Sequence, residues 1–481
     1  MNRSKILFLA QAAVVAAVLY TILGQVLVEY AGAVFGDAQA MPGLANVLPE
    51  AALVVVPAVI LLVVLELARR KGGEPLPRRL AFVGLALGGV ALGIVLAVAL
   101  WGVTGRMALK REIASLESQG LAAKMPDRVK PPDDDNAVIL LLKAQEKLTA
   151  SLGAGYHENE AFRALQKTLD RFAADGTVGA ELEAAKPMLA ANAEAIALAV
   201  QATGKKSAYW DIDFKAPVVQ VKIPEHLQHN ILVNLLALQA IERAQAGDTA
   251  GAASSIRAGL ALGDVIGASP LLFSQIFRSG VNTTLLAVGR RIFDTPAELA
   301  IADAAWGPYL DGSRMLDDTK RAFQADLLAV PREIAGGISP EESLGYQETP
   351  VGRLFGPIFY FSIRKTLQGE RPNLLACAPA AAGAAAIPRP APRLLSRAGR
   401  GAAYLAVARA AIDYAKAPIA ADQAAKGIGN DPFTGGPLKL VVGSNGALVF
   451  SVGPDGKDDG GAAFDRDKDL GDIAWTVTRT P

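Results

Sequence analysis

The sequence has little of the chemistry that most catalytic and redox proteins use. Cys377 is the single cysteine among 481 residues, which excludes a disulfide framework and any cysteine-rich metal or iron–sulfur site. The chain contains no His-Glu-x-x-His zinc motif, no Gly-x-Ser-x-Gly nucleophile motif, no phosphate-binding loop and no dinucleotide fingerprint. Its net charge is +1, so electrostatics give no reason to expect nucleic acid as a partner. These absences favour a binding or structural protein over an enzyme.

Charge is also scarce in the first 103 residues, where three apolar runs occur: Ile6–Val28, Ala51–Leu67 and Leu80–Val103. A transmembrane helix needs roughly 20 apolar residues. The alternative for the first run is a cleaved signal peptide, but the apolar core of such a peptide has only about 7–15 residues. The alternative for the second run is a buried core helix. We predict that residues 1–103 form a membrane anchor of three transmembrane helices in the lipid bilayer.

The lysines and arginines predict the orientation of this anchor. Arg3 and Lys5 precede the first run, five basic residues lie between the second and third runs, and none occurs between Lys5 and Arg69. The positive-inside rule places the N-terminus and the second loop in the cytoplasm. Three spans then leave Thr104 onward outside. In a bacterium this predicts a multi-pass inner-membrane protein whose large C-terminal region is periplasmic.

Small residues in the third run favour close packing of helices in lipid. Gly84 and Gly88 form one Gly-x-x-x-Gly pair, and Gly89 and Gly93 form another. The partner is either another span of the same chain or a second copy, which would make a homo-oligomer. The runs carry no ionisable residue at their centres, which argues against a transporter.

The chain from 104 to 375 is rich in alanine and helical in pattern, and we expect it to be a periplasmic α-helical domain. Pro224–Ala246 and Thr249–Gly267 predict a helical hairpin joined at Gly247-Asp248. The second helix of this hairpin resembles that of tetratricopeptide repeats, which bind protein partners on a concave face. A clean repeat period is absent from the sequence, so the expectation is an array of tetratricopeptide-like style.

An Ala/Pro-rich segment follows at 376–395, and we interpret it as a linker to a C-terminal module at 396–481. Ser396–Lys416 has the apolar spacing of a helix. Leu438–Val442 and Ala447–Val452 flank an Asn-Gly hairpin signal, and Ile473–Val477 alternates in the same way. The fold class is therefore mainly α: the membrane anchor, the helical domain, and a small helix plus three-stranded antiparallel β module.

An acidic loop separates the second and third of these predicted strands. Seven aspartates occur in the 18 residues from Asp455 to Asp472. Hard oxygen ligands on a glycine-rich loop suit calcium, which takes six to eight oxygens. The positions of glycine and glutamate do not match an EF-hand loop, and the alternative is a solvated acidic loop without metal.

Sequence motifs around this loop resemble the C-terminal region of the major pseudopilin of type II secretion. They are Asp431–Pro437, Phe450–Gly456, Gly460-Gly461 and Asp472-Ile473. The resemblance implies a calcium ion held by carboxylates and backbone carbonyls. It points first to Asp455 and Asp472, then to Ser451, and also to Asp458.

The resemblance covers only the chain from Ser396 onward. The sequence has no prepilin cleavage motif, and it has three apolar runs where a pseudopilin has one helix. The whole arrangement resembles bacterial envelope proteins to which no activity is attached. We therefore expect a scaffold or accessory subunit of an envelope complex with structural calcium. One alternative is an assembly factor related to type II secretion or pilus systems.

A second alternative is an envelope hydrolase that uses carboxylates. Asp211 and Asp213 flank Ile212, beside Trp210, and could act as a pair. His226 and His229 are three residues apart, so they share a helix face, but the sequence offers no third zinc ligand. We expect the two histidines to lie on a helix surface.

Overall fold

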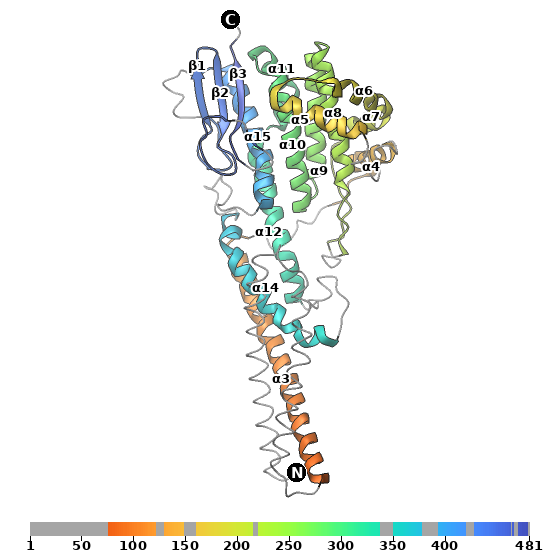
Figure 1. Cartoon of the computed structure of the whole chain (residues 1–481), viewed down its shortest axis with the longest axis vertical. Helices are drawn as coiled ribbons and strands as arrows, with labels where there is room; N and C mark the ends of the chain where they lie inside the picture. Colours follow the sequence, from red (N-terminus) through yellow and green to blue (C-terminus); the bar gives the residue numbers. More distant parts are fainter. Residues whose placement is uncertain are drawn as a thin grey trace. The chain divides into compact units, whose positions relative to one another are not determined.

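The computed structural model describes residues 76–121, 129–148, 160–214, 220–336, 350–377, 393–419, 428–462, 464–465 and 470–479, and within some helices only part of the side chains. The chain is mainly helical with a small C-terminal sheet, as predicted (Figure 1). It divides into two compact units. Unit 1 comprises Met1–Gln119, Phe214–Val221 and Leu327–Pro372, and unit 2 comprises Gly120–Asp213, Lys222–Asp326 and Asn373–Pro481.

The prediction of three transmembrane helices is not supported by the structure. The first two apolar runs lie outside the described residues, and the third lies within helix α3, Leu76–Glu117. In the part of the chain that the structure describes, no helix has both the length and the apolar character needed to cross a membrane.

Unit 1 contains α3, the C-terminal part of α12 and most of α14. Helix α12 spans Gly312–Gly336, and helix α14 spans Pro350–Ala376. Polar contacts join these helices beyond the apolar part of α3. The Arg106 Nε donates to the carbonyl of Ala335 at 2.9 Å. The carboxylate of Glu112 is buried and accepts from Arg371 Nη1 at 2.8 Å. These bonds fix the register of α3 against its two neighbours.

Unit 2 is built on a helical hairpin that the sequence predicted. Helix α8, His226–Gln245, and helix α9, Thr249–Gly267, pack against each other across a turn at Gly247, which has a φ of 78°. Asp248 caps α9 by accepting from the Gly251 amide at 2.8 Å. Helix α10, Leu272–Ile292, packs against both. Around them lie α4 (Ala137–Lys147), α5 (Glu160–Asp175), α6 (Ala180–Ala191), α7 (Ala193–Ala202) and α11 (Pro296–Trp306).

The C-terminal part has the predicted topology. Strands β1 (Lys439–Gly443), β2 (Gly446–Ser451) and β3 (Ile473–Thr478) form an antiparallel sheet in the order β1-β2-β3. Strands β2 and β3 pack on helix α15, Arg393–Lys416.

The C-terminal helix and sheet belong to the same compact unit as the helical hairpin. Helix α15 packs along α10, and the Trp475 indole donates to the carbonyl of Phe293 at 3.0 Å. Most of the predicted linker, from 378 to 392, lies outside the described residues. The domain boundaries at 103, 375 and 395 stay predictions.

Candidate functional site

Asp472 is the residue of the acidic loop with the most unusual surroundings. It precedes β3, its side chain is fully buried, and its Oδ2 atom accepts from the amides of Gly461 at 2.7 Å and Asp459 at 3.0 Å. Its Oδ1 atom is buried and has no hydrogen-bond partner among the described residues. Burial raises the pKa of the Asp472 carboxyl, and the negative charges of Asp459 and Asp458 add to this rise, although the two amides oppose it. An orphaned carboxylate oxygen beside other carboxylates suits a cation.

Glycines with positive φ bring the two ends of this loop together. Gly453 and Gly471 have φ values of 68° and 91°, and a Cβ atom on Gly453 would lie 2.3 Å from the carbonyl oxygen of Gly471. Only glycine permits such an approach. The turn that carries Asp455 therefore begins next to the backbone that leads into Asp472. Carboxylate and carbonyl oxygens are the ligands that calcium prefers.

The other three predicted ligands have protein partners. The Asp455 carboxylate accepts from the Lys457 amide at 3.2 Å. Asp458 accepts from the Gly460 amide and pairs with Lys439 at 3.4 Å. Ser451 is buried and donates its hydroxyl to Asp431 at 2.9 Å. Within the described ranges, no three His, Cys, Asp or Glu side chains are grouped so as to hold a metal. Residues 466–469, with Asp467 and Asp469, lie outside those ranges.

Asp431 organises this region, although the sequence reasoning did not single it out as a site residue. It is almost completely buried and accepts from the amides of Phe433 at 2.8 Å and Val452 at 3.1 Å, besides the Ser451 hydroxyl. These bonds tie the turn before β1 to the end of β2. Asp431 is the first residue of the Asp-Pro-Phe motif on which the pseudopilin resemblance rests. That motif was the feature of the sequence that could have identified it.

The prediction that His226 and His229 lie on a helix surface is wrong, because both are buried at the start of α8. Their Nδ1 atoms are 3.5 Å apart, and His226 Nε2 is 2.7 Å from the Ser274 hydroxyl. Burial lowers the pKa of His226 to about 3 and that of His229 to about 4, so both rings are neutral at pH 7. The segment with Trp210 covers this end of α8, and its indole packs edge-on against His226 with centroids 5.1 Å apart. The sequence could not reveal that Trp210 packs over these histidines, because this contact joins residues outside one local pattern.

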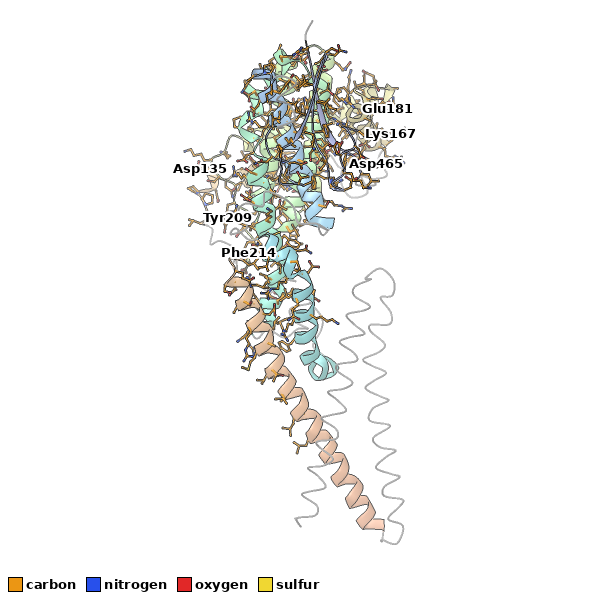
Figure 2. The ribbon with its side chains drawn as sticks, turned by 90° about the vertical axis from the view of Figure 1, so that its left-hand side faces the viewer. Asp135, Lys167, Glu181, Tyr209, Phe214 and Asp465 are labelled. Carbon is orange, nitrogen blue, oxygen red and sulfur yellow. The ribbon has the colours of Figure 1, made fainter. Side chains whose placement is uncertain are left out.

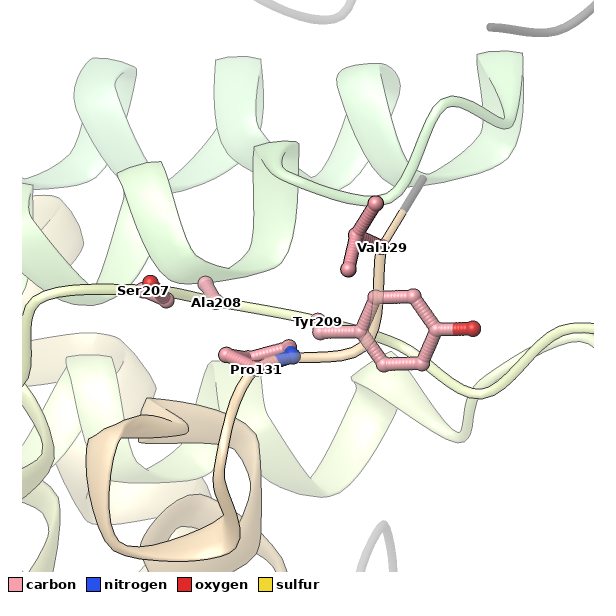
Figure 3. Close-up of a pocket in the computed structure, with 5 residues that line it drawn as sticks. All are labelled: Val129, Pro131, Ser207, Ala208 and Tyr209. Carbon is pink, nitrogen blue, oxygen red and sulfur yellow. The ribbon is translucent and has the colours of Figure 1, made fainter. Parts of the chain in front are cut away.

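The covering segment, residues 208–213 with Trp210, forms neither a helix nor a strand. Asn136, the N-cap of α4, fixes it by accepting from the Tyr209 amide at 2.9 Å and donating to the Tyr209 carbonyl at 3.0 Å. Tyr209 and Asp135 lie on the same side of the molecule in Figure 2. The Tyr209 ring lies beside Val129 and Pro131 at a cavity of about 350 Å³ (Figure 3).

A second cavity, of about 530 Å³, lies between this segment and α4. Asp211 lines it, and Asp213 is not among its described lining residues. The cavity wall is largely apolar, with Val138, Ile139 and Ile212 among its residues. The structure therefore does not bring the proposed carboxylate pair together in this cavity.

The four glycines of the two Gly-x-x-x-Gly pairs in α3 divide into two environments. Gly84 and Gly88 are exposed, and a Cβ atom on either would meet nothing within 4 Å. Gly89 and Gly93 are buried. Only the first pair therefore lies on an open face of the helix.

Comparison with known proteins gave no relatives: the chain matches no protein-family model, no curated protein and no solved structure.

Proposed function

We propose that this chain is a membrane-anchored envelope protein, a scaffold or accessory subunit whose C-terminal module is closed by a structural calcium ion. The observation that carries the proposal is an apolar stripe on α3. Leu92, Val95, Leu96, Leu100, Val103 and Met107 recur at helical spacing and are each between 49 % and 62 % exposed. At 1.5 Å per residue the stripe is about 23 Å long.

Such a stripe is costly in water, because exposed apolar side chains gain about 25 cal/mol for each Å² that leaves water. Five of its six members lie in the run Leu80–Val103, which contains no charged residue. The hydroxyl of Thr104 donates to the Leu100 carbonyl at 2.7 Å, an arrangement that satisfies a polar group without water. Gly84 and Gly88 continue the same open face and would let another span, or a second copy of the chain, approach closely. These features support lipid as the medium around this part of α3.

The sequence supports the remaining features of the anchor. Two further apolar runs precede α3, and the distribution of lysine and arginine places the N-terminus in the cytoplasm. Unit 2 would then be periplasmic in a bacterium. Its helices and the sheet would offer surfaces to protein partners in the envelope, in the manner of helical scaffolds.

Calcium fits the acidic loop through Asp472. The buried Oδ1 atom has no partner among the described residues, and burial raises the pKa of this carboxyl, so a cation would stabilise its charged form. Asp455 and backbone carbonyls of the loop would complete the oxygen ligands, with Asp458 joining after release from Lys439. The ion would be structural and would close a loop whose carboxylates repel one another.

The anchor is tested by location and labelling. In cells, the protein should stay with membranes after alkaline carbonate extraction. In a Cys377→Ala background, a cysteine at Ser444, in the exposed β1–β2 turn, should react with an impermeant maleimide added to spheroplasts. Release by carbonate would overturn the anchor, and labelling only after lysis would overturn the orientation.

The calcium site is tested by calorimetric titration of the metal-free full chain in detergent. Binding should disappear in Asp455→Ala/Asp472→Ala and persist in Asp413→Asn, which removes a carboxylate from the exposed side of α15. Absence of binding heat in the unaltered chain would leave an acidic loop without a metal and would not affect the anchor.

A further inference from the structure

Ion pairs set the level of α14 along α3. Arg371 contacts both Glu112, at 2.8 Å, and Ser115, at 3.2 Å, whereas Arg364 lies 3.9 Å from Glu112. Arg371, the later of the two arginines on α14, therefore also reaches Ser115, the later of the two residues on α3. The two helices run in the same direction, and both views show α14 beside α3 (Figures 1 and 2).

In this register the start of α14 lies at the same level along α3 as the apolar stripe. With a rise of 1.5 Å per residue, residues 350–357 lie about 10–20 Å before Arg364 along the helix. That distance corresponds to the level of α3 near residues 99–105, where Leu100 and Val103 are exposed. The first turns of α14 therefore lie at about the same level along α3 as the end of the stripe.

The sequence of this part of α14 suits the boundary between lipid and water. Residues 350–361 contain one charge, at Arg353, and four aromatic residues: Phe355, Phe359, Tyr360 and Phe361. Aromatic residues are enriched at membrane interfaces. Pro357 lacks an amide hydrogen and bends a helix, so the first turns need not follow the direction of α3.

Basic side chains lie just beyond the stripe. Lys110 and Arg111 on α3 and Lys365 on α14 are exposed. The two α3 residues come three and four positions after Met107, or about 5 Å along the helix. The headgroup layer on each side of a bilayer is about 5–8 Å thick. The buried carboxylate of Glu112, which directly follows Arg111 in the chain, is already paired with Arg371.

We infer that unit 1 makes a second contact with the membrane: the N-terminal half of α14 lies in the interface, and Lys110, Arg111 and Lys365 bind the phosphates of anionic phospholipids. This inference rests on the proposed membrane anchor. It adds a partner, the anionic lipid headgroup, that the apolar stripe alone does not specify. Each basic residue near such a surface contributes electrostatic attraction that salt screens.

The depth of α14 is tested with spin labels in nanodiscs, using single cysteines in a Cys377→Ala background. A label at Leu96 reports on the anchor, one at Phe355 on α14, and one at Ser444 on the aqueous side. Oxygen and nickel-chelate accessibilities should place Leu96 in lipid, Phe355 at the interface and Ser444 in water. An aqueous Phe355 with Leu96 in lipid would overturn the inference and spare the anchor. An aqueous Leu96 would overturn both.

The lipid class is tested by melting temperature in nanodiscs of phosphatidylcholine alone and mixed with phosphatidylglycerol. The full chain should melt higher in the anionic discs, and Lys110→Gln/Arg111→Gln/Lys365→Gln should lose most of that difference. The matched control is Lys143→Gln/Arg163→Gln/Lys167→Gln, which removes three exposed charges from unit 2. Inorganic phosphate added to the neutral discs should not reproduce the rise. Equal melting in both lipids, or equal loss in both triple variants, would overturn the inference.

Discussion

The hydroxyl of Ser451 donates to the Oδ1 atom of Asp431 at 2.9 Å, and both side chains are buried. Asp431 also accepts from two backbone amides, those of Phe433 and Val452. Asp431→Ala would leave three buried donors without an acceptor, each at a cost of about 1–3 kcal/mol. We expect it to lower the free energy of unfolding by about 3 kcal/mol or more in urea titrations of the full chain in detergent.

The comparison variant for Asp431→Ala is Ser451→Ala, which removes only one of the three bonds. It should cost about 1 kcal/mol. If the two variants cost the same, Asp431 does not connect β2 to the preceding turn as the geometry indicates.

The buried histidine pair predicts a loss of stability in acid. Both histidines have lowered pKa values in the folded state, about 3 for His226 and about 4 for His229, against an ordinary value of 6.5. The unfolded chain therefore takes up more protons as the pH falls below 6.5, and the folded state loses stability until the folded pKa values are reached. Each histidine contributes up to about 1.4 kcal/mol per pH unit in this window.

This acid sensitivity can be measured from urea midpoints between pH 7 and 4.5. His229→Phe should flatten the profile, because it removes one of the two buried titrating rings. Any general cost of that substitution appears at pH 7 as well and can be subtracted. An unchanged slope in the variant would show that His229 is protonated in the folded state over this range.

The parts of the fold that the sequence could predict are those fixed by local pattern. The α8–α9 hairpin, the Asn-Gly turn and the alternation in Ile473–Val477 each depend on residues close in the chain. The polar helix face that carries His226 and His229 has the same pattern whether or not another segment covers it. Its burial depends on Trp210, whose indole donates to the Val265 carbonyl and whose neighbour Tyr209 is bonded to Asn136. Such contacts between distant residues have no signature in one sequence.

The candidate site shows the same division. The density of aspartates predicts a place for a cation, and the structure adds that Asp472 Oδ1 lacks a partner among the residues it describes. It also shows that the Ser451 hydroxyl bonds to Asp431. Hydrogen bonds within the loop determine which oxygens are already satisfied, and composition alone carries no information on these bonds.

The ion pair between Glu112 and Arg371 should stabilise unit 1. Glu112 is buried and also accepts from Gln368 at 3.2 Å. Glu112→Ala leaves the guanidinium of Arg371 partly buried without its carboxylate, at a cost of about 2–3 kcal/mol. Limited proteolysis within α14 should accelerate accordingly. A cycle with Arg371→Ala and the double variant should give a coupling energy clearly above zero, and additive effects would contradict a direct pair.

The packing of α15 on α10 should depend on Gly401. Its amide donates to the Ser279 hydroxyl at 2.9 Å, and a Cβ atom at this position would lie 2.7 Å from the Ser279 Cα atom. Gly401→Ala must push the two backbones apart, so we expect a loss of about 1–3 kcal/mol in the free energy of unfolding. The control is Gly280→Ala on α10, where a Cβ atom meets nothing within 4 Å and alanine should stabilise the helix by about 0.5–1 kcal/mol. Opposite signs for these two variants are the expected result. A stabilising Gly401→Ala would mean that α15 does not pack closely on α10, and that the C-terminal sheet is attached to the helices less tightly than the Trp475 contact to Phe293 indicates.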